Sequence, residues 1–371
     1  MTPLWRFFDY WLSTATRDRE IVDAVVAPAH RGPSAELLES LRHWPGVHYW
    51  VEGDTAGRLM LARSLGRVTR ERWWLHGALF AATFLTVWLA GSVLAGADPH
   101  LPAISLAHLG RTARGMLDWF AGWRPGLEFA MGLMAILLAH ESGHYLTAKR
   151  YGINASPPYF LPAPPVLNFV GTFGAFIRLR SPVADRQQLL DVGAAGPWAG
   201  FVVAVIVLAV GMLASHPVAP VDAISPQMVI VGRTTIYLGD SLLMAGVRHL
   251  FMGGGVVLLH PLAFAGWLGV LVTMLNLLPL GQLDGGHVLY ALLGRRQAWL
   301  GVAAWLALLV LGHWFWGWWV WAFFTLLLGR GSLAHPTVLD RHRPVPPSHR
   351  PFGWATVLLF VLTFTTVPFY V

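Results

Sequence analysis

The chain has 371 residues, of which 55% are hydrophobic and only 12% are charged. Soluble domains carry about 25% charged residues, so this composition excludes an ordinary soluble protein and indicates a lipid bilayer as the main surrounding. Basic residues in loops at a membrane surface explain the formal charge of +7, so nucleic-acid binding is not needed to account for it. The absence of cysteine excludes disulfides, thiolate metal ligands and a cysteine nucleophile. At the start of the chain, Arg6 and Asp9 interrupt the apolar residues, so no cleavable signal peptide is expected.

Residues 1–74 are the only sizeable stretch of soluble composition. Apolar residues recur at helical spacing in 33–44 and 53–74, with charges between them, so we expect helices in both segments. We predict a cytoplasmic N-terminal arm or small domain over 1–74 and a transmembrane domain over 75–371.

Seven apolar windows approach the roughly 20 helical residues that cross a bilayer. They lie at 75–96, 126–148, 191–213, 256–279, 298–313, 314–329 and 353–371. The fifth and sixth are short and rich in tryptophan, which fits either a tight helical hairpin or one span followed by an interfacial segment. The fold class predicted from the windows is an all-α polytopic membrane protein with about six to seven transmembrane helices.

The basic residues predict the orientation in the membrane. Of 26 Lys and Arg, 21 fall in 1–74, 149–190, 281–297 and 330–352, and the remaining five fall in 97–125 and 214–255. Cytoplasmic loops are enriched in Lys and Arg, so the first group is expected on the cytoplasmic side. We predict an integral, multi-pass protein of a bacterial or archaeal cell membrane.

The sequence AHESGHYLTAKR (139–150) places an ionisable cluster near the end of the second window. His140, Glu141 and His144 fit the pattern H-E-x-x-H. Two histidines four residues apart lie about 40° apart on a helix, so both can bind one metal ion while Glu141 reaches a water beside it. A charge in hydrocarbon costs about 3 kcal/mol, which favours a functional role for this cluster.

A purely structural role would have both histidines bonded to neighbouring carbonyls and Glu141 paired with Lys149 or Arg150. Those cations lie about two turns further along the helix, and their side chains would more readily extend to the interface. The metal site is therefore the favoured interpretation.

A catalytic zinc needs three protein ligands and one open position. The candidates for the third ligand are Asp284, His260, His287 and His216. Asp284 is favoured because the second and fourth windows run in the same direction in the predicted topology, which places it at the depth of His140. A packed or interfacial position is the simpler interpretation of His260 and His287, and a solvated one of His216.

The residues around Asp284 are expected to interrupt the helix and turn its carboxylate toward the bundle. They are Pro279, Gly281, Gly285 and Gly286. An ordinary Asp-Gly turn at the membrane edge is the alternative.

The loop 149–190 is predicted to contain a small β-hairpin element on the cytoplasmic side. NFVGTFGAFIRLR (168–180) combines β-branched and aromatic residues with glycines, and its free edge would pair with an unwound substrate. A plain interfacial hairpin is the alternative. PPYFLPAPPV (157–166) cannot form a regular helix and is expected to lead the chain back toward the membrane.

The motif at 140–144, followed by Asn276-x-x-Pro279-x-x-x-x-Asp284-Gly285, resembles the site-2 protease family of intramembrane zinc metalloproteases. The resemblance covers a protease core of about 126–290 and includes Ala195-Gly196-Pro197, similar to the family's middle core helix. The N-terminal arm, the extra C-terminal spans and GTFGAFIRLRSP (171–182) are most similar to the subgroup that includes plant chloroplast members. Another branch carries a PDZ domain between the motifs, for which 214–255 is too short.

The resemblance implies that His140, His144 and Asp284 bind zinc, that Glu141 is the general base and that Asn276 contacts the substrate backbone. It implies hydrolysis of peptide bonds in or near transmembrane segments of membrane-protein substrates, at a site near the cytoplasmic side. A buried amide needs a hydrogen-bond partner, and a neighbouring helix carbonyl is the alternative for Asn276.

Other classes of membrane protein fit less well. A membrane protease with glutamate as the third ligand is disfavoured because no glutamate follows Glu141. A di-iron desaturase would need several histidine boxes, whereas His140 and His144 are the only histidines four residues apart. A catalytically inactive zinc-binding scaffold and a metal transporter remain the alternative functions.

Overall fold

The computed structural model describes most of the chain. The described residues are 4–15, 19–32, 34–51, 57–64, 71–94, 123–164, 168, 170–180, 183–219, 224–231, 234–336, 338 and 343–370. Helices dominate, but these residues also form sheets of four, five and two strands. The prediction of an all-α fold is therefore wrong, because segments outside the long helices satisfy their backbone groups by strand pairing.

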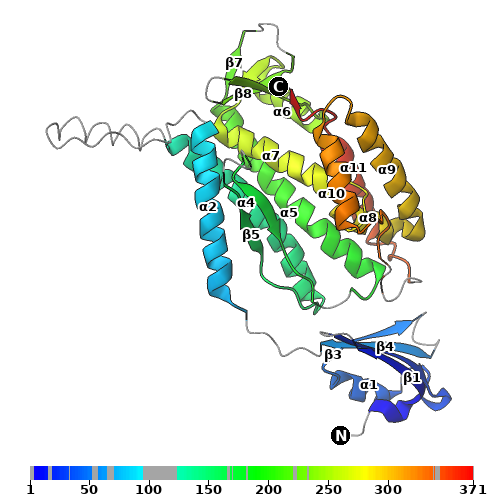
Figure 1. Ribbon diagram of the computed structural model, residues 1–371. Coiled ribbons are helices and arrows are strands. Elements are labelled where there is room, and N and C mark those ends of the chain that lie inside the picture. Colours follow the sequence, from blue (N-terminus) through cyan, green and yellow to red (C-terminus); the bar gives the residue numbers. More distant parts are fainter. Residues whose placement is uncertain are drawn as a thin grey trace, which may run out of the picture.

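The four-stranded sheet lies in the N-terminal part, at the lower end of the molecule in Figure 1. Its strands follow the antiparallel order β1-β2-β4-β3, and one face is covered by helix α1 and the short 3₁₀-helix η1, with η2 after β2. The elements are η1 Leu4–Phe7, β1 Phe8–Ala15, β2 Arg19–Val26, η2 Pro28–His30, α1 Ala35–Arg42, β3 Gly46–Val51 and β4 Arg58–Ser64.

The helix expected in 33–44 is present as α1. The prediction of a helix in 53–74 is wrong for residues 58–64. That stretch is β4, and it pairs with both β2 and β3. Leu59 and Leu61 are buried at every second position, which is the period of a strand. The sheet also contacts the helical part, since the Tyr49 hydroxyl donates to Asp185 at a distance of 3.0 Å.

Long and short helices make up the remainder of the chain. They are α2 Trp73–Leu94, α4 Arg124–Arg150, α5 Arg186–Leu213, α6 Leu242–Met252, α7 Pro261–Asn276, α8 Asp284–Leu293 with the 3₁₀-turn η5 Gly294–Arg296, α9 Gln297–Leu311, α10 Gly317–Leu328 and α11 Arg350–Thr363. Within the described ranges, α2 and α5 are long and apolar enough to cross a membrane, and α6, α7, α10 and α11 are shorter apolar helices. The total of six to seven spans stays a prediction.

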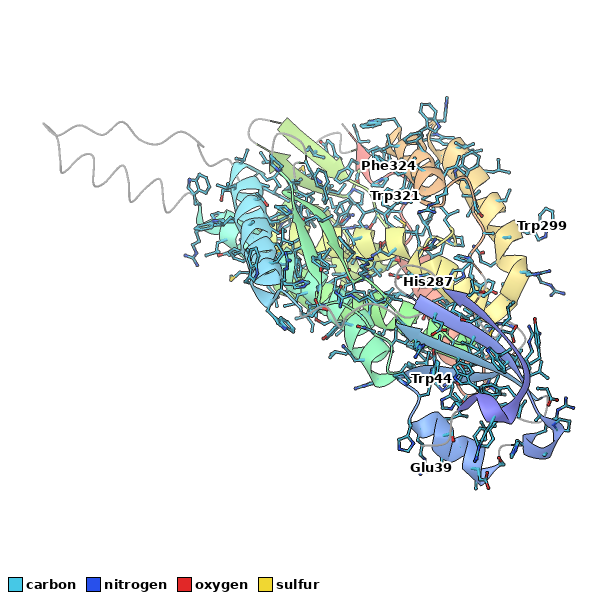
Figure 2. The ribbon with its side chains drawn as sticks, turned by 60° about the horizontal axis from the view of Figure 1, so that its bottom comes forward. Glu39, Trp44, His287, Trp299, Trp321 and Phe324 are labelled. Atoms are coloured by element: carbon cyan, nitrogen blue, oxygen red, sulfur yellow. The ribbon has the colours of Figure 1, made fainter. Side chains whose placement is uncertain are left out.

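The tryptophan-rich windows form the tight helical hairpin that was one of the two alternatives. Helices α9 and α10 run side by side, and the Trp305 indole donates to the Ala322 carbonyl at 2.9 Å. Trp318 of this pair is buried, but Trp319, Phe323 and Phe324 are exposed, and Trp299 is 80% exposed (Figure 2). An outward apolar face of this kind fits contact with lipid.

Two windows are only partly helical. Window 256–279 begins as strand β10 (Val256–Leu258), and its helix starts at Pro261, a residue favoured in the first helical turn. Window 353–371 ends as a helix at Thr363 and continues to strand β11 (Phe369–Tyr370). Both strands join one sheet, so the pairing of their backbone groups decides these boundaries.

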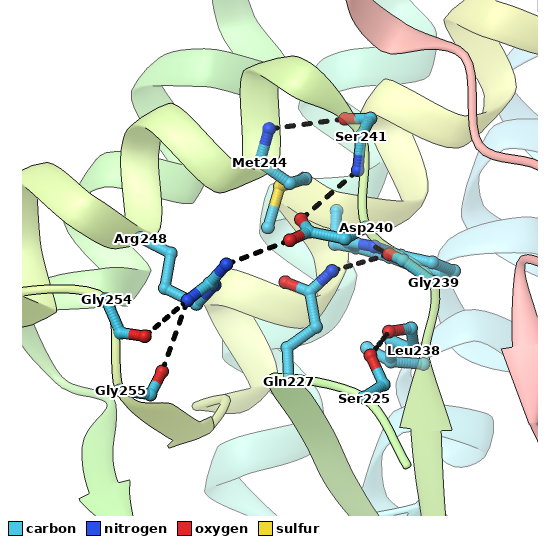
Figure 3. Close-up of polar contacts among 11 residues, drawn as sticks. Ser225, Gln227, Leu238, Gly239, Asp240, Ser241, Met244, Arg248, Gly254 and Gly255 are labelled. Atoms are coloured by element: carbon cyan, nitrogen blue, oxygen red, sulfur yellow. Dashed lines mark hydrogen bonds and ion pairs between the residues drawn. The ribbon is translucent and has the colours of Figure 1, made fainter.

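This five-stranded sheet lies at the end of the molecule opposite the N-terminal sheet (Figure 1). Its order is β11-β9-β8-β10-β7, with β7 His216–Val218, β8 Gln227–Val231 and β9 Thr234–Leu238. Figure 3 shows the polar contacts that hold it to α6: Arg248 pairs with Asp240 at 2.9 Å and donates to the Gly254 carbonyl at 2.7 Å. The segment too short for a PDZ domain is thus a small cap of strands and one helix.

The predicted β-hairpin is present beside α2 and α4. Strands β5 (Tyr159–Pro162) and β6 (Thr172–Phe176) pair antiparallel. Strand β5 comes from the proline-rich segment 157–166, which was expected not to form a regular helix and for which no strand was predicted. Tyr159 to Leu161 retain their N–H groups and pair with β6. The Thr86 hydroxyl of α2 holds the hairpin turn by donating to the Gly171 carbonyl at 2.7 Å.

Helices α4, α5 and α7 pack closely at the centre of the helical part. Glycines allow the close approach, because a Cβ added at Gly143 of α4 would lie 2.4 Å from the Ala195 carbonyl oxygen of α5. A Cβ at Gly266 of α7 would lie 2.6 Å from the Leu208 backbone of α5. This packing sets how near α5 lies to the side chains of the H-E-x-x-H motif.

Candidate metal centre

Three side chains of the predicted site meet at one point. His140 and His144 project from one face of α4, are 5% and 8% exposed, and have their Nε2 atoms 3.1 Å apart. Asp284, the first residue of α8, brings its Oδ2 atom to 3.3 Å from each of these nitrogens. The three atoms form a nearly equilateral triangle.

This donor set fits zinc. Ligands at 2.0–2.1 Å from a tetrahedral ion lie about 3.3 Å apart, which matches the edges of the triangle. Two imidazole nitrogens and one carboxylate oxygen are donors that zinc accepts, and three protein ligands leave a fourth position open. Among the described residues, His140, His144 and Asp284 are the group of metal-ligand side chains that lies close enough together to hold an ion.

The turn that separates helices α7 and α8 positions Asp284. Helix α7 ends at Asn276, and the turn before α8 includes Gly281 with a φ of +48°. Within α8, a Cβ at Gly285 would lie 1.9 Å from the Leu277 carbonyl oxygen. The predicted interruption is therefore present, but Gly285 belongs to the first turn of α8 and serves its close packing on the end of α7.

Helix α5 forms the wall behind the two histidines. The Nδ1–H of His144 donates to the Val192 carbonyl at 2.7 Å, which leaves its Nε2 lone pair for a metal. Gly196, in the Ala-Gly-Pro sequence noted above, faces this ring, since a Cβ there would lie 2.0 Å from the His144 Nε2. No sequence signal could have identified Val192, because its contribution is a backbone carbonyl.

Glu141 and Asn276 lie at the same centre. Glu141 is buried, and it lines the same cavity as both histidines and as Ile177, just after β6. The Asn276 amide donates to the His140 Nε2 at 3.2 Å. The partner of Asn276 is thus a site histidine, and the alternative of a helix carbonyl is not what the structure shows.

A cavity of about 560 Å³ opens at the metal centre. Hairpin residues, the start of α5, the α7–α8 turn and a segment after α10 line it. The described lining residues are His140, Glu141, His144, Ala175, Phe176, Ile177, Leu179, Val183, Leu189, Val192, Gly193, Asn276, Gln282, Leu283, Asp284, His287, His335, Pro336 and Val338.

The other candidate histidines do not join the donor triangle. His260 caps the start of α7, and its Nε2 lies 3.3 Å from Glu128, which is twelve residues and about 18 Å along α4 from His140. His216 is exposed in β7. His287 lines the cavity but bonds to His335, a residue that gave no signal in the sequence because it is an isolated histidine in a loop.

Comparisons with known proteins point to the same part of the chain. Residues 128–310 match the model of peptidase family M50. The probable zinc metalloproteases EGY2 and EGY1, chloroplastic, of Arabidopsis thaliana are 35% and 36% identical over 180 and 173 residues, which is 47% and 46% of this chain. The rice (Oryza sativa subsp. japonica) EGY1 is 36% identical over 172 residues, or 46% of this chain.

These matches cover part of each protein. The aligned region spans 30% of both Arabidopsis relatives and 28% of the rice relative. No solved structure matches significantly. The matched residues contain both halves of the metal centre and the helices that carry them, so the chain contains a peptidase family M50 (site-2 protease) domain over residues 128–310 and is homologous there to the plant EGY zinc metalloproteases.

Proposed function

We propose that the chain is an intramembrane zinc metalloprotease that hydrolyses peptide bonds in or near transmembrane segments of membrane proteins. The observation that carries this proposal is the triangle of His140, His144 and Asp284 donor atoms beside Glu141 at the floor of a cavity. The relatives' names describe probable zinc metalloproteases, which supports the reaction class.

The roles of the site residues follow from their positions. A zinc ion held by the three ligands would supply Lewis acidity toward a peptide carbonyl and toward water. Glu141 would take the proton of the attacking water and pass it to the nitrogen of the leaving amine, which balances the hydrolysis. The Asn276 amide now bonds to an atom that would be a metal ligand, so with metal bound it would be available to the substrate backbone.

The membrane location is also a proposal. The apolar helices and the exposed tryptophans of α9 and α10 support a lipid surrounding. His140 lies ten residues before the basic end of α4 at Arg150, about 15 Å along the helix, which supports a site toward the cytoplasmic side. The named relatives are chloroplastic, so the similarity does not support the bacterial or archaeal cell membrane predicted from the sequence.

The hairpin offers a way to hold an unwound substrate. The Arg178 carbonyl and the Arg180 N–H group form hydrogen bonds with the backbone of the segment before β5. Because backbone groups alternate in direction along a strand, those of Ala175 and Ile177 face the other edge. These two residues line the cavity. We propose that the substrate adds to this edge as an extended strand, which exposes its carbonyls to the metal centre.

Strand addition predicts a period of two in the substrate. We expect proline substitutions at successive positions on one side of the scissile bond to slow cleavage at alternate positions, because only every second N–H faces β6. The loss of one such bond would lower the rate by about two- to tenfold. The measurement is the cleavage rate of a proline-scanned reporter. Equal effects at neighbouring positions, or a period near 3.6, would contradict strand addition.

The protease activity itself is tested with the purified full chain in proteoliposomes. We expect it to cut a single-span reporter, to lose this activity with 1,10-phenanthroline and to regain it with zinc, since the reaction needs the metal. Zinc flux into the same vesicles is measured in parallel. Flux without reporter cleavage would favour a transporter, and bound zinc with neither flux nor cleavage would favour an inactive scaffold.

A further inference from the structure

A second segment lines the cavity besides the hairpin. After α10 the chain returns across the start of α8, and we call residues 332–336 together with Val338 the strap. His335, Pro336 and Val338 of the strap line the cavity. None of them belongs to the H-E-x-x-H motif or to the pattern around Asp284, and the proposed reaction assigns them no role.

A buried glutamine fixes the strap to the α7–α8 turn. The Gln297 amide is 1% exposed and donates to the Pro279 carbonyl at 3.0 Å and to the Leu333 carbonyl at 3.3 Å. Its oxygen accepts from the His335 N–H at 3.0 Å. The Gly281 N–H also donates to Leu333, at 3.0 Å. The strap is therefore joined to the same turn that positions Asp284.

A pair of histidines fixes the strap to α8. His287, labelled in Figure 2, has its Nδ1 atom 2.7 Å from the His335 Nε2. The His335 Nδ1–H donates to the Pro336 carbonyl, so its Nε2 is the acceptor and His287 is the donor. Burial lowers the pKa of His335 to about 3, which keeps the ring neutral. The ring also stacks on Tyr290, with centroids 4.7 Å apart.

The far end of the strap is apolar. Val338 is buried in a cluster with Leu189, Leu190 and Val288 of α5 and α8. Within the cavity, Val183, Leu189 and Val192 line the same space as Pro336 and Val338. Beyond the metal ligands, this part of the cavity therefore presents hydrocarbon, and a charged substrate side chain placed there would lose its hydration without a partner.

We propose that the strap forms the wall of an apolar specificity subsite for one substrate side chain beside the scissile bond. This inference rests on the proposed protease function. A substrate held along β6 with its scissile bond at the metal centre occupies the cavity that the strap also lines, so a side chain beside that bond would contact Pro336 and Val338. Gln297 and His287 act as positioning residues, because they hold the strap without lining the apolar part themselves.

The test uses reporters that differ at one residue near the scissile bond. Each of three positions on either side carries Ala, Leu or Asp in turn, and kcat/KM is measured with the purified full chain. We expect the native protein to prefer Leu over Asp at a single position. Pro336→Trp, at an exposed residue, should lower the Leu-to-Ala ratio at that position by about tenfold or more, since it fills the subsite.

Loosening the strap should have a different signature. His335→Ala removes the bond to His287 and is expected to reduce the Leu-to-Asp preference by about tenfold while zinc content is unchanged. His335→Gln can still accept from His287 and should retain most of the preference. His313→Ala, an exposed histidine in the turn between α9 and α10, is the matched control and should leave the ratios unchanged.

The outcomes separate this proposal from the function on which it rests. Cleavage by the native protein with unchanged ratios in both Pro336→Trp and His335→Ala would overturn the subsite and leave the protease intact. If the native protein cuts no reporter, the protease function fails, and the subsite fails with it.

Discussion

Glu141→Gln is expected to abolish cleavage of a membrane-anchored reporter while the protein keeps its zinc. The amide retains the shape of the carboxylate but cannot take a proton from water, and general-base catalysis contributes about 10²- to 10⁴-fold to a rate. None of the three donor atoms at 3.1–3.3 Å belongs to Glu141, so metal binding is preserved. Initial cleavage rates and zinc content per chain are measured on the same preparation.

Glu128→Gln is the matched control on the same helix. Glu128 pairs with Arg124 and His260 three turns from the site, so its change should leave both readouts near native values. Unlike Glu141→Gln, His140→Ala and Asp284→Ala should lose zinc as well as activity. Full cleavage by Glu141→Gln would remove its role as base, and native zinc content in Asp284→Ala would assign the third ligand to another residue, with His260 tested next.

Gly196→Ala is expected to lose zinc although residue 196 is not a ligand. The added Cβ would lie 2.0 Å from the His144 Nε2, and the ring cannot retreat easily because its Nδ1 is held by Val192 at 2.7 Å. The imidazole must therefore turn away from the triangle. Disturbing a group that orients a ligand costs about 10- to 100-fold in metal affinity, and a direct clash should cost at least as much.

Gly77→Ala provides the control for this substitution. Gly77 is also in an apolar helix, α2, but nothing lies within 4 Å of a Cβ added there. Zinc affinity is measured by competition with a chromophoric chelator, and folding is followed by thermal unfolding in detergent. Native zinc affinity in Gly196→Ala, with a normal unfolding temperature, would show that α5 does not constrain the ligand geometry.

Local spacing in the sequence was enough to predict which donor side chains meet. His140 and His144 share a helix face because they are four residues apart, and their position in an apolar segment marked them as functional. Asp284 was reached from helix direction and from the Pro and Gly residues around it. The long apolar helices and the presence of a hairpin in the loop after α4 were also predictable, because each depends on neighbours within a short stretch of chain.

The errors occurred where the sequence pattern was weak or where distant partners decide the structure. Residues 58–64 were expected to be helical, but β2 and β3 pair with both edges of this stretch and make it a strand. The end of window 353–371 became β11 because β9 offers an edge more than 130 residues earlier. Whether a distant strand leaves an edge free for pairing cannot be predicted from the local sequence pattern.

By itself, then, the sequence determined that this protein is rich in apolar helices and carries an H-E-x-x-H pair with a distant aspartate. Only the tertiary structure decided that the Val192 carbonyl orients His144, that Gly196 makes room for it, and that the strap and the hairpin line one cavity. The physical reason is the range of the interactions: helix periodicity is set by residues three or four positions apart, whereas a backbone carbonyl or a close approach acquires its role only when separate helices pack.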